Sequence, residues 1–203
     1  MVGSLYLPVL VLVFGLAQTL LRMIEIIREH SVDISLLPAK ATILDLGCRG
    51  FAFTNHFREL GHTVHAVDID DLQHGDYDQC AITNYTGMCG ITHTGDPQGT
   101  KIGPGDSIRC YTLEDYMKLK GVEFYDLIKS DCEGEEIKIV ESLTEAPAKM
   151  LSIEWHLHTG QDPKGVYWAV KRLNELGYET IKHELTEAHG AGYNNWDSLF
   201  ILK

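Results

Sequence analysis

The sequence has few basic residues and no basic tract. Its 17 lysines and arginines stand against 29 aspartates and glutamates, which gives a formal net charge of −12. A surface this acidic repels the phosphates of nucleic acids and of anionic lipids. We therefore expect no nucleic-acid partner.

Paired cysteines are also missing. The chain has five cysteines, an odd number, and no two of them form a C-x-x-C motif. This spacing excludes a zinc knuckle and a thioredoxin-type redox site. Several of the cysteines lie in apolar runs, where cysteine behaves as a small hydrophobic residue, so a reducing, cytoplasmic setting is the natural interpretation.

The N-terminus lacks a basic region and a small-residue cleavage site, which argues against a cleaved signal peptide. Residues 5–21 are nevertheless almost entirely apolar. As a helix they would measure roughly 25 Å, slightly less than the ~30 Å core of a bilayer. We predict that residues 1–30 form a hydrophobic helix. It is either a membrane anchor, through residues 5–21, or a helix that packs on the domain or on a partner.

Strand and helix patterns alternate through the rest of the chain, residues 31–203, which we expect to form one domain. This alternation predicts an α/β fold with a mostly parallel sheet and helices on both faces. Residues 86–107 contain six glycines and two prolines and should form a long loop or an irregular hairpin. The expected strands are 42–47, 62–70, 78–83, 125–131, 149–157 and 198–203, and the expected helices are 54–60, 112–120, 135–143 and 163–177.

A glycine turn follows the first of these strands, with the sequence D-L-G-C-R-G at residues 45–50. A dinucleotide site would have G-x-G-x-x-G here, but Asp45 occupies the position of the first glycine. A carboxylate there is unfavourable for a diphosphate and suits a ligand that carries a cationic amine. The lysine and spacing of a P-loop are absent, which excludes a nucleoside triphosphate site of that kind.

Asp68 ends the second strand, 21 residues after Gly47. A carboxylate at this place accepts hydrogen bonds from both hydroxyls of a ribose. A ribose at one end and an ammonium group at the other describe S-adenosylmethionine, although the turn alone could be purely structural. We predict that this cofactor is bound by Asp45, Gly47, Cys48, Gly50, Phe51, Asp68, Ile69, Ala81, Ile82 and Asp131.

Three further segments carry a family resemblance: T-L-E-D at 112–115, K-S-D-C-E-G at 129–134 and E-W-H at 154–156. They resemble the FkbM family of S-adenosylmethionine-dependent methyltransferases, with its T-L-D-D helix start and its K-I-D-V-E-G and E-x-H strand ends. The resemblance implies a class I methyltransferase fold with a seven-stranded sheet. It also implies methylation of a hydroxyl group on a small molecule or glycan. Ser130 and Cys132 replace apolar residues of that pattern, and Arg49 stands where many methyltransferases have a small residue.

A hydroxyl nucleophile must lose its proton as the new bond forms, and histidine is the usual base. The period of a strand places Glu154, His156 and His158 on one face, near Asp131. We interpret His156 as the general base, and Glu154 as the residue that orients it or holds the substrate hydroxyl. Asp131 completes the predicted catalytic set. The alternative is that these are polar strand-end residues bonded to local backbone.

Other interpretations stay open. Asp131, Glu154 and His156 could hold a divalent metal, although we assign none. Glu135 and Glu136 should be solvated acids that complement a helix N-terminus. Residues 193–196 could line a substrate pocket. The competing functions are a nicotinamide-dependent oxidoreductase and a catalytically idle relative that docks to a membrane or a partner.

Overall fold

The centre of the molecule is one seven-stranded sheet, described here from a computed structural model. The structure describes residues 22–73, 75–93, 100–157, 162–187 and 194–203. In spatial order the strands are β11 (Tyr178–Glu187), β12 (Asn194–Leu202), β10 (Ala148–His156), β9 (Tyr125–Ser130), β3 (Thr42–Leu46), β4 (Thr63–Asp68) and β5 (Asp78–Gln79).

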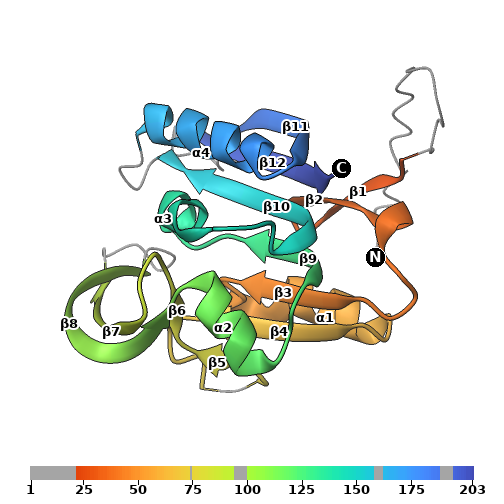
Figure 1. Ribbon diagram of the computed structural model, residues 1–203. Helices are drawn as coiled ribbons and strands as arrows, with labels where there is room; N and C mark the ends of the chain where they lie inside the picture. The colour runs from red at the N-terminus through yellow and green to blue at the C-terminus, as the bar shows by residue number, and fades with distance from the viewer. Residues whose placement is uncertain (1–21, 74, 94–99, 158–161, 188–193) are drawn as a thin grey trace.

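All neighbouring strands of this sheet run parallel except β12, which is antiparallel to both β10 and β11. Figure 1 shows the arrowheads of β3, β9 and β10 on one side and that of β12 on the other. This order, with one reversed strand next to the edge, is the class I methyltransferase arrangement. The predicted fold class is confirmed.

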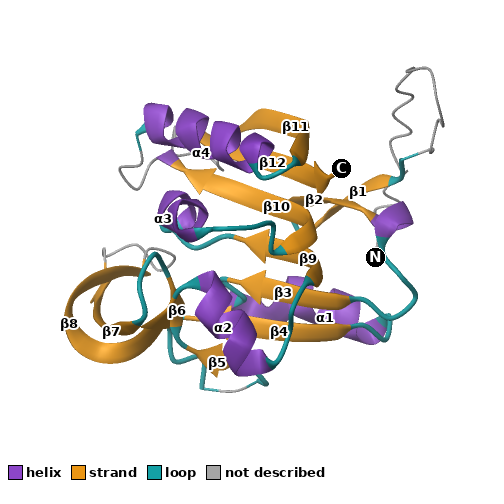
Figure 2. Cartoon of the chain, viewed as in Figure 1, coloured by secondary structure: helices purple, strands orange, loops and turns teal. Residues whose placement is uncertain are grey.

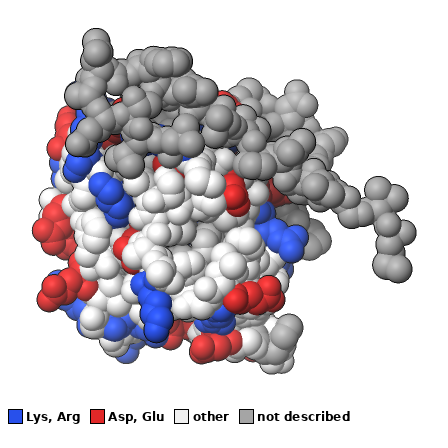
Figure 3. Space-filling view, turned by 90° about the vertical axis from the view of Figure 1, so that its right-hand side faces the viewer, with Lys and Arg blue, Asp and Glu red and all other residues white. Residues whose placement is uncertain are grey.

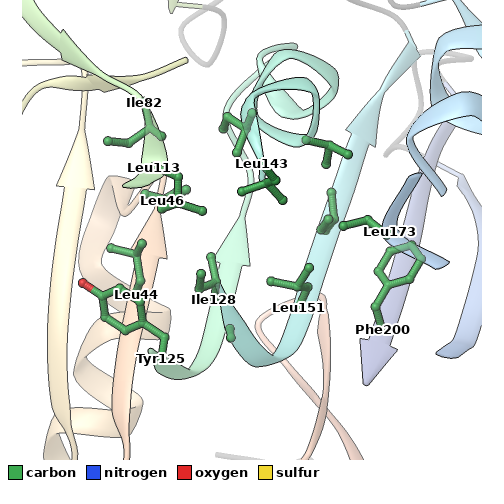
Figure 4. Packing of buried hydrophobic residues seen from close by; sticks show 14 of the residues in the cluster. Leu44, Leu46, Ile82, Leu113, Tyr125, Ile128, Leu143, Leu151, Leu173 and Phe200 are labelled. Atoms are coloured by element: carbon green, nitrogen blue, oxygen red, sulfur yellow. The ribbon is translucent and has the colours of Figure 1, made fainter. Parts of the chain in front are cut away.

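Helices cover both faces of the sheet, as predicted (Figure 2). One face packs against α2 (Leu113–Lys120), α3 (Glu136–Ser142) and α4 (Pro163–Glu175), and the other packs against α1 (Ala52–Glu59). Each face has its own hydrophobic cluster: the first cluster lies against α2, α3 and α4, and the second lies against α1. Successive strand residues point to opposite faces, so Leu44 and Leu46 belong to the first cluster and Ile43 belongs to the second. Figure 4 shows Leu44, Leu46, Ile128 and Leu151 reaching from the strands into the first cluster.

The ends of the helices follow the capping signals. Thr112 caps α2 by accepting a hydrogen bond from the amide of Asp115, and Gly121 ends it in the left-handed region with φ 67°. Asp162 caps α4, and Pro163 occupies its first turn. These local signals explain why the predicted helix boundaries lie close to those observed.

The glycine-rich segment is an irregular hairpin. Strands β7 (Gly87–His93) and β8 (Thr100–Tyr111) are antiparallel, and β6 (Ala81–Ile82) joins them in a second sheet of order β6-β8-β7. The register shifts between Cys89 and Gly90. A Cβ on Gly90 would lie 1.9 Å from the carbonyl oxygen of Pro104, so only glycine fits this shift. The expected third strand, 78–83, is divided between β5 and β6.

The N-terminal part of the described chain corrects the sequence interpretation. Instead of continuing a helix to residue 30, it forms a hairpin of β1 (Ile24–Ile27) and β2 (His30–Asp33), which crosses the predicted boundary at residue 31. Arg28 and Glu29 make its turn, with φ values of 50° and 74°. The spacing of apolar residues in this segment fits a helix, but strand pairing and the burial of Ile27 and Val32 in the second cluster favour the hairpin. Residues 1–21, including the predicted membrane contact 5–21, lie outside the described residues.

The described surface carries charges of both signs. On the face in Figure 3, acidic and basic side chains lie near one another, without a continuous basic patch on the part that the described residues form. Within the described ranges no helix combines the length and apolar character that crossing a membrane requires.

The hairpin gives a first testable expectation. A chain that begins at residue 31 should be less stable than one that begins at residue 22, because it loses β1 and the buried Ile27 side chain. Burial of one such side chain contributes about 1.5–3 kcal/mol. Urea denaturation of the two chains measures the difference in free energy of unfolding, and equal values would contradict this role of the hairpin.

Candidate active site

A cleft of about 1070 Å³ opens at the carboxyl ends of β3, β4, β9 and β10, the edge at which sheets of this kind bind ligands. Its volume is at the upper end of the range for small-molecule sites. Phe51 does not line it, because its ring packs instead against Tyr77, with centroids 5.8 Å apart. All the other predicted site residues do: Asp45, Gly47, Cys48, Gly50, Asp68, Ile69, Ala81, Ile82, Asp131, Glu154 and His156.

The glycine turn is clamped between two neighbouring strand ends. The amides of Gly47 and Cys48 both donate to the carbonyl of Val67, at 2.9 and 3.1 Å. Gly47 has φ +76°, and a Cβ on it would lie 1.8 Å from the carbonyl oxygen of Asp131. Gly50 has a similar φ of +75°, but its missing Cβ would meet nothing within 4 Å. Close packing therefore requires glycine at position 47, whereas a side chain at position 50 would meet no neighbouring atom.

Asp45 has its cationic partner inside the protein. Its side chain is fully buried and lies 3.1 Å from the ammonium of Lys129, and it accepts a 2.5 Å hydrogen bond from Thr54. Burial lowers the pKa of Lys129, but the carboxylates of Asp45 and Asp131 outweigh burial and hold it well above its ordinary value. Lys129 also donates to the Gly47 carbonyl at 2.6 Å. Asp45 thus supports the turn from inside the protein, and its predicted contact with a ligand amine stays a prediction.

Lys129 was missed as a functional residue. It begins the K-S-D-C-E-G segment at residues 129–134, in which the sequence predicts a role for Asp131 alone. The signal was available, since a lysine inside an otherwise apolar strand needs a buried counter-charge.

Asp68 stands where the sequence predicts a ribose-binding carboxylate. It ends β4, is 6% exposed, and accepts a 2.9 Å hydrogen bond from the amide of Asp70. Burial raises the pKa of Asp68. Ile69, Ala81 and Ile82 line the cleft as well, so the cleft offers the Asp68 carboxylate together with apolar side chains suited to a nucleoside.

Asp131 is the centre of a buried ionic cluster. Its Oδ1 lies 3.2 Å from His156 Nε2, and its Oδ2 lies 3.3 Å from Lys129 Nζ. Burial raises the pKa of Asp131, but Lys129, His156 and His30 outweigh burial and hold it well below its ordinary value. On the other side of the imidazole, His156 Nδ1 lies 2.9 Å from Glu136 Oε1. His156 therefore joins the turn after β9 to the start of α3.

This geometry revises the role predicted for His156. Both of its ring nitrogens face carboxylates, an arrangement that stabilises the imidazolium form of the ring. Burial lowers the pKa of His156, but Glu136 and Asp131 outweigh burial and raise it to about 11. A doubly protonated ring cannot accept another proton, so these contacts favour a positioning role for His156, and the general-base role stays a prediction.

Glu136 and Glu135 also correct an expectation. Glu136 is 1% exposed and accepts a hydrogen bond from the amide of Cys132 at 2.8 Å. Glu135 is buried as well and accepts a hydrogen bond from the hydroxyl of Thr83. Neither is a solvated acid at the helix start. Acidic residues are common in the first turn of any helix, so the sequence alone could not show that these two have specific partners inside the protein.

Two more carboxylates and a second histidine line the cleft beside Asp131. Burial and the Asp131 charge raise the pKa of Glu133 to about 7, against the opposing charge of His156. Burial raises the pKa of Glu154, which accepts a 2.7 Å hydrogen bond from Asn195. His30 reaches the cleft from β2, with its Nε2 3.6 Å from Asp131 Oδ2.

The sequence interpretation missed His30, because it placed this residue in a helix outside the domain. His158 and residue 193 lie outside the described residues. Two sets of side chains bring three possible metal-ligand atoms within 4.8 Å of one another: His30, Asp131 and Glu154, and Asp131, Glu133 and His156.

Comparisons with known proteins concern the fold alone. No family model matches the chain, and no curated protein matches it in sequence. The Mtq2–Trm112 complex of E. cuniculi, which methylates the eRF1 translation termination factor, is 14% identical with a TM-score of 0.45, over 82% of this chain and 87% of that one. A TehB-like SAM-dependent methyltransferase from Corynebacterium glutamicum is 15% identical, with a TM-score of 0.42, over 83% and 84%. The Methanococcus jannaschii fibrillarin pre-rRNA processing protein is 13% identical, with a TM-score of 0.48, over 86% and 71%.

Proposed function

We propose that the protein is an S-adenosylmethionine-dependent methyltransferase that acts on a hydroxyl group of a small molecule or glycan. The observation that carries the proposal is the cleft itself. On a sheet with the class I strand order, it brings the glycine turn, Asp68 and the Asp131 cluster to one edge. The hydroxyl acceptor rests on the resemblance of residues 112–115, 129–134 and 154–156 to the FkbM family.

The residues of the cleft fit the cofactor. Asp68 would accept hydrogen bonds from the ribose hydroxyls, and Ile69, Ala81 and Ile82 offer apolar contacts for the adenine. The open side of Gly50 lets the cofactor approach the backbone of the turn. When bound, the cofactor supplies a methyl group already activated on a sulfonium.

The chain's own task is then to align the acceptor and to receive its proton. Alignment of two bound reactants contributes several kcal/mol, up to roughly 7–11 in favourable cases. Glu154 borders the cleft and accepts a hydrogen bond from Asn195, which supports a role in gripping the acceptor hydroxyl. Asp131 and Glu133 are the neighbouring carboxylates, and His156 fixes the orientation of Asp131.

Calorimetric titration of the full-length chain with S-adenosylhomocysteine, and separately with NAD, tests the proposal. We expect binding of the nucleoside and none of NAD. Asp68→Ala should weaken binding by about 100-fold or more, since each hydrogen bond to a charged group contributes about 1.5–3 kcal/mol. Asp71→Ala is the matched control, because Asp71 is an exposed carboxylate three residues further on and should bind as the wild type does.

Each other outcome has a distinct meaning. NAD binding in place of S-adenosylhomocysteine would favour the oxidoreductase, and binding of neither would favour a catalytically idle relative. Unchanged affinity in Asp68→Ala would remove the proposed ribose contact.

A further inference from the structure

We propose that the cleft also contains a binding site for one divalent transition-metal ion, formed by His30, Asp131 and Glu154. These residues come from β2, from the turn after β9 and from β10, and their donor atoms lie within 4.8 Å of one another. Metal bonds of about 2.0–2.2 Å place ligand atoms roughly 3–4 Å apart, so small side-chain movements complete the site. The inference does not depend on methyl transfer.

His30 is the observation that points to a ligand. The side chain is 3% exposed, yet its Nδ1 has no hydrogen-bond partner. Its Nε2 faces Asp131 Oδ2 at 3.6 Å, longer than a normal hydrogen bond. A buried polar atom without a partner costs about 1–3 kcal/mol. An ion bound at Nε2, the ring nitrogen that faces Asp131, would give this buried imidazole one strong bond in place of the long contact.

The charge of the cleft favours a cation. Nine acidic side chains line it against four lysines and arginines. Three of the four, Lys129, Lys182 and Arg49, are already paired with Asp45, Asp197 and Asp70. The remaining negative charge attracts a positive ion into a partly enclosed volume, where screening by water is weaker.

The donor set indicates which ions fit. An imidazole with two carboxylates suits Mn²⁺, Fe²⁺ or Zn²⁺ better than Ca²⁺ or Mg²⁺, which prefer oxygen ligands alone. Three protein ligands leave coordination positions open toward the cleft, as in catalytic sites. Lys129, 3.3 Å from Asp131 Oδ2, shares this carboxylate and limits the affinity.

The second set of side chains is less suitable. In it, His156 would have to release the hydrogen bonds that its two nitrogens make with Glu136 and Asp131. His30 makes no comparable pair of contacts. For this reason the proposed site uses His30, whereas the sequence alternative used His156.

Titration of the chelator-stripped, full-length chain with Mn²⁺, followed by electron paramagnetic resonance, tests the site. Mn²⁺ is preferable to Zn²⁺ because the five cysteine thiols would compete for zinc. We expect one equivalent to bind, and His30→Gln and Glu154→Gln to weaken binding by about tenfold or more. His65→Gln is the matched control, because His65 is a partly buried histidine bonded to Tyr125 and does not line the cleft.

The proposal is overturned if the wild type binds no Mn²⁺, or if both cleft variants bind it as tightly as His65→Gln does. Glu154→Gln keeps the test decisive if His30→Gln fails to fold. A parallel titration with S-adenosylhomocysteine separates the two proposals. Mn²⁺ binding without nucleoside binding leaves the metal site and removes the methyltransferase, and the reverse result removes only the metal site.

Discussion

Replacement of Gly47 by alanine is expected to destabilise the protein by about 2–5 kcal/mol, through a left-handed backbone and a forced overlap. Gly47 has φ +76°, and the new Cβ would lie 1.8 Å from the carbonyl oxygen of Asp131. This oxygen belongs to backbone that is held to β3 by the hydrogen bond from Asp131 N to the Leu46 carbonyl. Neither side of the contact can move without breaking strand pairing. Chemical denaturation gives the change in free energy of unfolding.

Gly50→Ala is the matched control for this prediction. Gly50 has nearly the same backbone angle, φ +75°, but its added Cβ would meet nothing within 4 Å. Only the conformational cost remains, about 1–2 kcal/mol. If both variants lose the same stability, the close approach of the turn to Asp131 is not what requires glycine at position 47.

Lys129→Met is expected to cost about 3–5 kcal/mol, because it leaves the fully buried Asp45 carboxylate without its counter-charge. Methionine keeps most of the side-chain volume and removes only the ammonium. Asp45 is fully buried and Asp131 lies 3.3 Å from the lysine, so both lose an ion pair. Thermal and chemical unfolding measure the loss.

Two further variants isolate the cause of that loss. Asp45→Asn combined with Lys129→Met should recover part of the stability, because the uncompensated charge is then removed. Lys118→Met removes an exposed ion pair with Asp115 and should cost no more than about 1 kcal/mol. A loss in Lys129→Met as small as that in Lys118→Met would contradict the supporting role of the buried pair.

The fold could be predicted from local patterns because the class I sheet is made of short strand–helix units. Caps such as Thr112 and left-handed glycines such as Gly121 mark the unit boundaries directly in the sequence. The positions of the glycine turn and Asp68 were predicted in the same way, since the turn follows an apolar strand and Asp68 ends the next one. Features that depend on residues close in the sequence were therefore predicted well.

The parts of the site that were missed depend on partners far along the chain. Lys129 pairs with Asp45, 84 residues away, and His156 pairs with Glu136 at the start of the preceding helix. No periodicity specifies such pairs. His30 was misplaced because Arg28 and Glu29 form a tight turn without the glycine or asparagine that usually marks one.

The proposed function requires that the cleft hold a nucleoside cofactor between the glycine turn and Asp68. Hydrogen–deuterium exchange of the full-length chain, with and without S-adenosylhomocysteine, tests it most directly. Slower exchange of amides in residues 45–51, 68–70 and 81–83, with little change in the remote helix α4, is the predicted result. No protection in these segments at saturating ligand, or protection confined to other parts of the chain, would contradict the account.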